Sequence, residues 1–301
     1  MADADYVARP DEQDTPSGLR AVFMAAKKLS FQVGDIARAW PRPPKGEETF
    51  PVNTLRMLEM VARVHFAAGV SLLYEDWLSY STDLHLRALA EIYAHVAWIR
   101  EKGGVTALMT PRGRAVCLEL GMARALQTEL AELSADTPLT ADATSVAAIG
   151  QEVTALQAAH ASHNCTCDGR GRGYRTVRPT LAEMAKADPK VRARGAEWMY
   201  GYWKTASRVS HHSGFERMVK LHPSGARQVA PAEPWQRVGT FSALVTAYGS
   251  ILEWTLELHP TANARALHDQ LRSLLTDSAV QAAAAMRPQA RPAPSKLGRR
   301  C

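Results

Sequence analysis

Apolar residues recur at every third or fourth position along most of this sequence, and this spacing limits the fold more than any other feature. The period matches one face of an α-helix, which repeats every 3.6 residues. Residues 17–40 give one example, with apolar side chains at Leu19, Val22, Phe23, Ala26, Leu29, Phe31 and Val33. Proline and glycine clusters such as Pro41–Gly46 interrupt the pattern, because both residue types end helices. The sequence therefore predicts an all-α protein.

These helical stretches are long enough and close enough together to form a single multi-helix bundle. Helices are expected at residues 17–40, 53–80, 81–103, 111–133, 140–163, 181–187, 190–213, 234–258 and 261–275. That makes about eight or nine helices joined by short connections. The exception is residues 214–232, where Met218–His222 and Ala226–Val229 flank a Pro-Ser-Gly turn. This pattern favours a small hairpin or irregular excursion.

Composition divides the chain into a folded body and two ends. Residues 1–16 are acidic and polar and are expected to form a disordered leader, and residues 17–276 to form the helical bundle domain. Residues 277–301 are a basic tail rich in alanine, proline and arginine, which is also expected to be disordered. Five positive charges lie in the last fifteen residues, so the net charge of +6 leaves only +1 for the rest. A nearly neutral body argues against a strongly basic nucleic-acid-binding face.

The apolar segments and the cysteines favour a cytoplasmic protein without a membrane anchor. The most apolar helix, around Val61–Leu73, carries Arg63 and His65. It therefore has no uninterrupted apolar run of the roughly 18–20 residues that cross a bilayer. The N-terminus has neither the basic nor the apolar region of a signal peptide. The four cysteines do not have the spacing of a disulfide framework.

A group of potential metal ligands follows the fifth expected helix. His160, His163, Cys165 and Cys167 form the pattern H-x-x-H-x-C-x-C, and all four are zinc-type ligands. Structural zinc sites usually close a longer loop between two ligand pairs, and C-x-C is tighter than the usual C-x-x-C. We therefore expect no cofactor, with zinc at this cluster as the alternative.

Arg217 and His222 have the Arg-x4-His spacing that is of interest for RNA cleavage. The spacing is weak evidence, since roughly two or three Arg-x(4–6)-His matches arise by chance in a chain with this arginine and histidine content. The pair also falls in the expected hairpin rather than at the start of a helix. An RNA-cleaving toxin that uses these two residues is one alternative function.

Two polar pairs with helical i,i+4 spacing form the main candidate site. Arg87 and Glu91 share a face of the third helix, and Ser207 and His211 share a face of a later one. The first pair is either an ion pair at the rim or a buried polar site. The second lacks the G-x-S-x-G context of a serine hydrolase. We predict that the four side chains face one another across two packed helices, because burying either pair alone would leave a charge without a partner.

The segments that hold these pairs resemble a known family. Leu86–His95 reads LRALAEIYAH and Tyr202–Ser213 reads YWKTASRVSHHS. Together they resemble the bacterial domain-of-unknown-function family 5677, with its "L-R-x-L-x-E" helix and its later "Y-x-x-x-S-x-x-x-H-x-S" segment. The resemblance covers roughly residues 55–256. Ser207, His211 and Ser213 match the second motif, and Trp203 stands where the family usually has tyrosine.

The resemblance implies a HEPN-like helical protein of bacterial defence, a group in which many members are ribonucleases. The Arg-x(4–6)-His motif of those enzymes is absent around His211, because Arg208 lies only three positions before it. The expected function is therefore a defence- or stress-associated helical protein with a polar Arg/Glu/Ser/His site, and whether it is an enzyme is left open. A non-catalytic structural or protein-interaction module is the other alternative. Expected partners are RNA or a protein encoded nearby, and a homodimer is allowed.

Overall fold

The computed structural model describes six helices, one pair of short strands and a few separate residues. The helices are α1 (Ser17–Ala39), α2 (Phe50–Glu75), α3 (Tyr80–Arg100), α4 (Pro111–Asp136), α5 (Ala143–Ala161) and α10 (Pro234–Leu258). The strands are β1 (Val219–Leu221) and β2 (Arg227–Val229). Residues 203, 265–266, 269–270, 272–274 and 277 are also described. The predicted all-α fold is confirmed.

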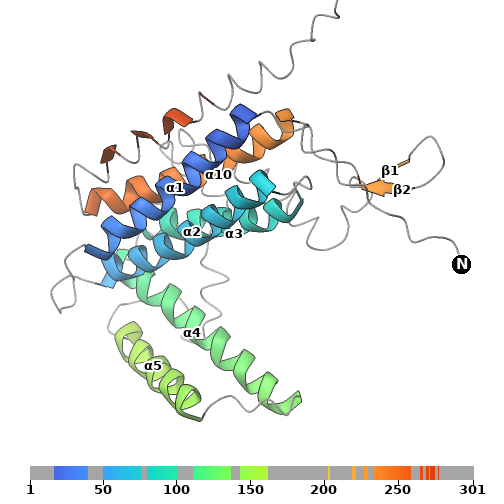
Figure 1. Ribbon diagram of the computed structural model, residues 1–301. Coiled ribbons are helices and arrows are strands. Elements are labelled where there is room, and N and C mark those ends of the chain that lie inside the picture. Colours follow the sequence, from blue (N-terminus) through green and yellow to red (C-terminus); the bar gives the residue numbers. More distant parts are fainter. Residues whose placement is uncertain are drawn as a thin grey trace, which may run out of the picture.

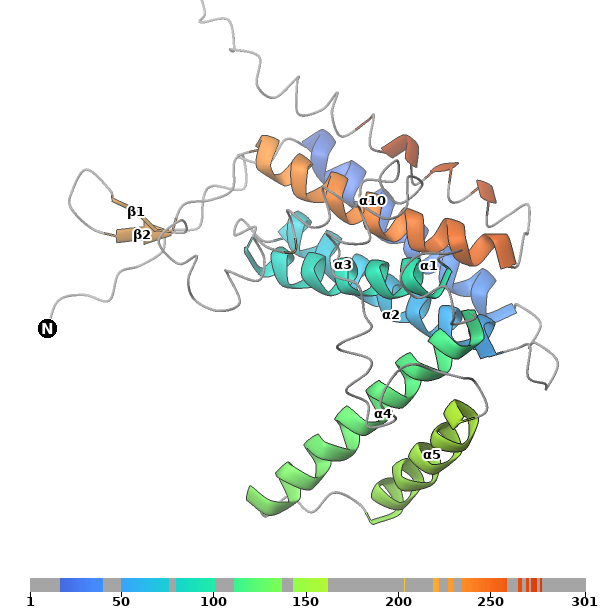
Figure 2. The same cartoon turned by 180° about the vertical axis from the view of Figure 1, so that it is seen from behind.

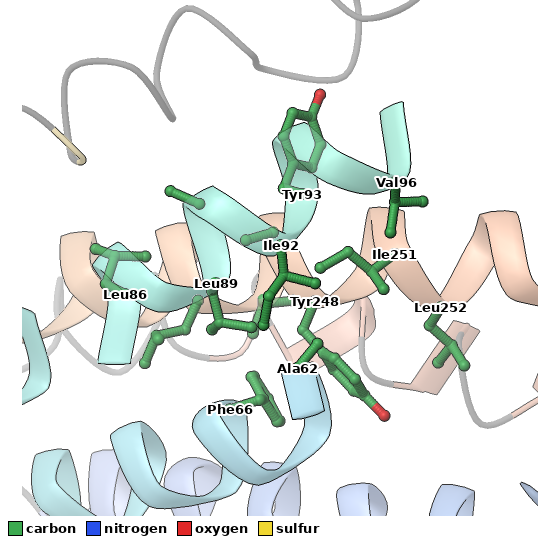
Figure 3. Close-up of a cluster of buried hydrophobic side chains, with 14 of the residues drawn as sticks. Ala62, Phe66, Leu86, Leu89, Ile92, Tyr93, Val96, Tyr248, Ile251 and Leu252 are labelled. Carbon is green, nitrogen blue, oxygen red and sulfur yellow. The ribbon is translucent and has the colours of Figure 1, made fainter. Parts of the chain in front are cut away.

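Four helices, α1, α2, α3 and α10, form a bundle with α2 at its centre. Figure 1 and Figure 2 show these helices side by side from opposite directions, and α2 packs against each of the other three. The core between them is rich in aromatic residues. The rings of Phe66 on α2 and Tyr248 on α10 stack at 4.7 Å, and Phe23 on α1 contacts Phe241 on α10. Figure 3 shows the side chains of α2, α3 and α10 that meet there.

Helix α2 begins earlier than its sequence pattern suggested. We expected Asn53 or Thr54 to cap it, but the helix starts at Phe50 and takes Pro51 into its first turn, where proline is tolerated. Thr54 is instead fully buried within the helix and donates a hydrogen bond to the Glu119 carboxylate of α4. Thr54 thus joins α2 to α4 and does not cap the N-terminus of α2.

Within the described residues, the segment Val52–Tyr74 of α2 is long and apolar enough to cross a membrane. A core helix of a soluble protein passes the same test, and α2 contacts α1, α3 and α10, although only 39% of this segment is buried. Its charged residue Glu59 is 1% exposed and is bonded to α10. The expectation of a cytoplasmic protein without a membrane anchor stays a prediction.

Helices α4 and α5 form an arm that leaves the bundle (Figure 1). The first half of α4 is buried against α2 and α3. There the fully buried Arg114 donates a hydrogen bond from Nη1 to the carbonyl oxygen of Trp98, 2.8 Å away in the last turn of α3, where helix carbonyls lack partners within the helix. Beyond Arg124 most described residues of α4 are exposed.

Helix α5 lies along α4 and is held by a separate, smaller cluster. Its members are Leu120, Ala123, Ile149, Val153 and Leu156. Val153 and Leu156 lie one helical turn apart on α5, so a single apolar stripe faces α4. The arm therefore has its own core, distinct from that of the bundle.

The expected hairpin is confirmed, and it lies outside the bundle in both views (Figure 2). Strands β1 and β2 pair antiparallel, with Val219 opposite Val229. The helices predicted at 181–187 and 190–213 lie outside the described residues except for Trp203, which is helical. The predicted leader, and the predicted tail beyond Asp277, also lie outside them.

Candidate functional site

The Arg87–Glu91 pair exists and is joined by a residue from far along the chain. Arg87 Nε donates a hydrogen bond to Glu91 Oε1 at 3.3 Å, one turn further along α3. The same carboxylate oxygen accepts a second hydrogen bond from Trp203 Nε1 at 3.1 Å. The Trp203 ring also packs against the edge of the bundle core. One carboxylate thus binds its own helix and a segment 112 residues away.

The site lies at the rim of the bundle rather than deep inside it. The side chains of Arg87 and Glu91 are 29% and 36% exposed. The sequence allowed either an ion pair at the rim or a buried polar site, and the geometry falls between the two. The ion pair lies at the rim, but Glu91 also binds Trp203, which is partly buried against the core. The charges keep contact with solvent, so burial does not force this pair to meet another one.

Several predicted site residues lie outside the described part of the chain. Ser207 and His211 follow Trp203 by four and eight positions. The contact of Trp203 with Glu91 brings the start of their segment to α3, and their own positions stay a prediction. Arg217 and His222, the alternative pair, flank the described strand β1 and also lie outside.

A second polar network lies deep in the bundle and was missed from the sequence. Glu59 of α2 accepts a hydrogen bond from the Tyr248 hydroxyl of α10 at 3.0 Å. Arg63, one turn along α2, places Nε 3.3 Å from the same carboxylate oxygen. Burial raises the pKa of Glu59, while the Arg63 charge and the Tyr248 hydrogen bond oppose that rise. Burial and the Glu59 charge raise the pKa of Tyr248, which keeps its hydroxyl a donor.

The position of Arg63 depends on a glycine of α1. A Cβ atom at Gly34 would overlap the guanidinium nitrogen Nη1 of Arg63. The guanidinium group of Arg63 therefore packs against the backbone of α1 at Gly34, where there is no side chain. This gives Gly34 a packing role, because a larger residue would require the guanidinium group of Arg63 to shift.

Two histidines form a third polar contact, between α2 and α3. The Nδ1 atoms of His65 and His85 lie 3.1 Å apart, and the ring planes are tilted by 50°. Both side chains are half-buried. Burial lowers the pKa of each imidazole, and the neighbouring ring lowers the pKa of His85 further. Both effects favour the neutral form of the imidazoles.

The predicted zinc-type cluster is represented by one described residue. His160 is buried near the end of α5, whereas His163, Cys165 and Cys167 lie outside the described residues. In the described helices and strands, no three His, Cys, Asp or Glu side chains gather closely enough to hold a metal ion. The expectation that the cluster holds no zinc stays a prediction.

The missed contacts left different traces in the sequence. Glu59, Arg63 and His65 are ionisable residues inside the most apolar helix, and an ionisable group within an apolar stripe usually has a partner. That signal could have marked α2 as the carrier of polar contacts. It gives no indication of the partners, since Tyr248 is 189 residues from Glu59.

Comparisons with known protein families, curated proteins and solved structures give no match to this chain. The resemblance to family 5677 therefore depends on the two segments around Arg87 and His211 alone. The assignment stays a prediction.

Proposed function

We propose that this chain is a HEPN-like, defence-associated helical protein whose working site is built on Arg87 and Glu91 of α3. The observation that carries the proposal is the hydrogen bond from Trp203 to Glu91. It joins the two segments on which the family resemblance depends, at a position where the family's second motif usually has tyrosine. Such a contact supports a common site for Arg87, Glu91, Ser207 and His211.

The partial exposure of Arg87 and Glu91 is compatible with binding of an anionic substrate. Arg87 is held through Nε by Glu91 while its side chain stays 29% exposed. A guanidinium oriented by a carboxylate is well suited to bind phosphate. In the proposed site Arg87 binds an RNA phosphate in the cytoplasm, and His211 transfers a proton. A nearby-encoded protein or a second copy of the chain is the proposed regulator.

Expression of the full chain in bacteria tests the proposal, with growth and RNA integrity as readouts. We expect wild-type protein to arrest growth and fragment RNA, and Arg87→Gln and His211→Ala to abolish both. Asp35→Asn is the matched control, because it removes an exposed ion pair with Arg38 on α1. Intact RNA and normal growth with the soluble wild-type protein, alone and with its neighbouring genes, would contradict the proposal.

The structural alternative is favoured by the position of Trp203. Its indole both donates to Glu91 and packs against the core edge, as expected if the three residues only fasten a distant segment to α3. Glu91→Gln separates the two functions, because the amide still accepts from Trp203 but no longer pairs with Arg87 as a charge. A loss of stability in Trp203→Phe, which removes the indole donor to Glu91, without any change in RNA integrity favours the structural module.

The RNA-cleaving toxin with Arg217 and His222 is tested in the same assay. In that case the double variant Arg217→Ala/His222→Ala loses RNA cleavage and Arg87→Gln keeps it. The opposite pattern places the activity at α3.

A further inference from the structure

We propose that His65 and His85 form a two-histidine binding site for a divalent transition-metal ion of the Zn²⁺ type, bound between α2 and α3. The two residues come from neighbouring helices, and their Nδ1 atoms face each other at 3.1 Å. This site is separate from the Arg87–Glu91 pair and from the His160–Cys167 cluster. It therefore does not depend on the proposed function.

The distance between the nitrogens fits two ligands of one metal ion. Zinc binds imidazole nitrogen at about 2.0–2.1 Å, so two such nitrogens at a tetrahedral angle are about 3.3 Å apart. The rings are tilted by 50° with centroids 5.4 Å apart, so they are not stacked face to face. In the absence of metal, one ring donates an N–H to the other, as this distance also allows.

The backbone around the pair is arranged for this close approach. Gly69 lies one turn after His65 on α2, and a Cβ atom there would be 3.4 Å from His85 Cβ and 3.1 Å from Leu244 Cδ2. The missing side chain lets α3 and α10 both approach α2 at this turn. His85 is thereby placed over the turn of α2 between His65 and Gly69, with its ring directed at His65.

The chemistry of the site indicates exchangeable binding. Imidazole is the commonest metal ligand among side chains and binds in its neutral form. No third His, Cys, Asp or Glu joins the pair within the described helices, and both histidines are partly accessible to solvent. Water or an outside ligand would fill the remaining positions. A bound ion would join α2 to α3 and stabilise the bundle in proportion to its concentration.

Zinc titration of the full-length protein after chelator treatment tests the proposal, in a Cys165→Ser/Cys167→Ser background that removes the thiols of the other candidate zinc cluster. We expect ZnCl₂ to shift the ¹⁵N resonances of the His65 and His85 Nδ1 atoms and to raise the melting temperature. His65→Ala and His85→Ala should each weaken zinc binding at least about tenfold, since even the loss of a residue that supports a metal ligand costs that much. His95→Ala, ten residues along the same helix, should leave the affinity unchanged.

Two results would overturn the proposal. One is the absence of a change in the two Nδ1 resonances at saturating zinc, which identifies the contact as a plain histidine–histidine hydrogen bond. The other is an affinity that His95→Ala lowers as much as His85→Ala. The resonance measurement uses the intact histidine pair, so it decides the question even if an alanine variant fails to fold.

Discussion

The bundle and the arm bury their apolar residues in different ways. Helix α2 packs against three other bundle helices, and their shared core contains Trp98, Tyr93, Tyr248, Phe23, Phe66 and Phe241. Helix α5 packs mainly against α4, through aliphatic residues of a cluster that contains no described aromatic ring. Local stability follows the number of buried contacts. We therefore expect the arm to open at a lower free energy than the bundle.

The largest effect should come from the bundle core. Phe66→Ala removes a ring stacked on Tyr248 and should lower the free energy of unfolding by about 3–5 kcal/mol. Denaturant unfolding measures it. The matched control is Phe31→Ala on α1, whose ring is 59% exposed, and which should stay within about 0.5 kcal/mol. If both variants lowered the free energy of unfolding equally, Phe66 would contribute no more to stability than the exposed Phe31, and the prediction would be wrong.

The arm should respond less, and locally. Leu156→Ala removes a buried side chain of α5 and should cost about 2–3 kcal/mol, the lower half of the usual range for leucine. Amide hydrogen exchange should become faster in α5 while α2 and α3 stay protected. Leu126→Ala on α4 is the control, because that side chain is 45% exposed. Faster exchange throughout α2 would mean that arm and bundle unfold together.

Removing one hydroxyl tests the polar network within the bundle. Tyr248→Phe keeps the ring but takes away the donor to the buried Glu59, and should cost about 1–2 kcal/mol because the carboxylate loses a hydrogen bond. Adding Glu59→Gln should increase the loss, because it also removes the carboxylate that pairs with Arg63. A Tyr248→Phe variant as stable as wild type would show that Glu59 does not need the tyrosine.

The smallest change in the free energy of unfolding is expected at Glu119, where α4 of the arm contacts α2 of the bundle. This change should depend on pH. Burial raises the pKa of Glu119, the hydrogen bond from Thr54 opposes the rise, and the charge of Glu152 on α5 adds to it. Its folded-state pKa is thus above the unfolded value, so its contribution to stability is complete below about pH 4.5 and is lost as the pH rises through the folded pKa.

Glu152→Gln should therefore stabilise the protein by a few tenths of a kcal/mol at pH 8, where it removes a like charge beside Glu119. At pH 4 the variant and wild type should have the same stability. Unfolding curves at the two pH values measure the difference. A gain of the same size at both pH values would show that repulsion from Glu119 is not its cause.

Local sequence patterns predicted the helices well and the contacts between them poorly. Helix α10 and the start of α4 follow from periodicity and proline positions, as does the hairpin from its turn residues. The Arg87–Glu91 pair could also be predicted from the sequence, because i,i+4 spacing is local. The contacts of Trp203 with Glu91 and of Thr54 with Glu119 were not, since they depend on how distant helices pack. Thr54 was predicted to cap the start of a helix, because nothing in the sequence indicated that its hydroxyl binds Glu119 of α4.

Helix α4 has a mechanical consequence, because it is one unbroken helix that belongs to both regions. Its 26 residues extend about 39 Å at 1.5 Å per residue. One end is held by the hydrogen bond from Arg114 to the last turn of α3, and α5 packs against the middle of the helix, at Leu120 and Ala123. A small tilt of α4 about Arg114 would therefore displace its far end by several ångströms. A partner bound to the arm would in this way act, through Arg114, on the last turn of α3, the helix that carries Arg87 and Glu91.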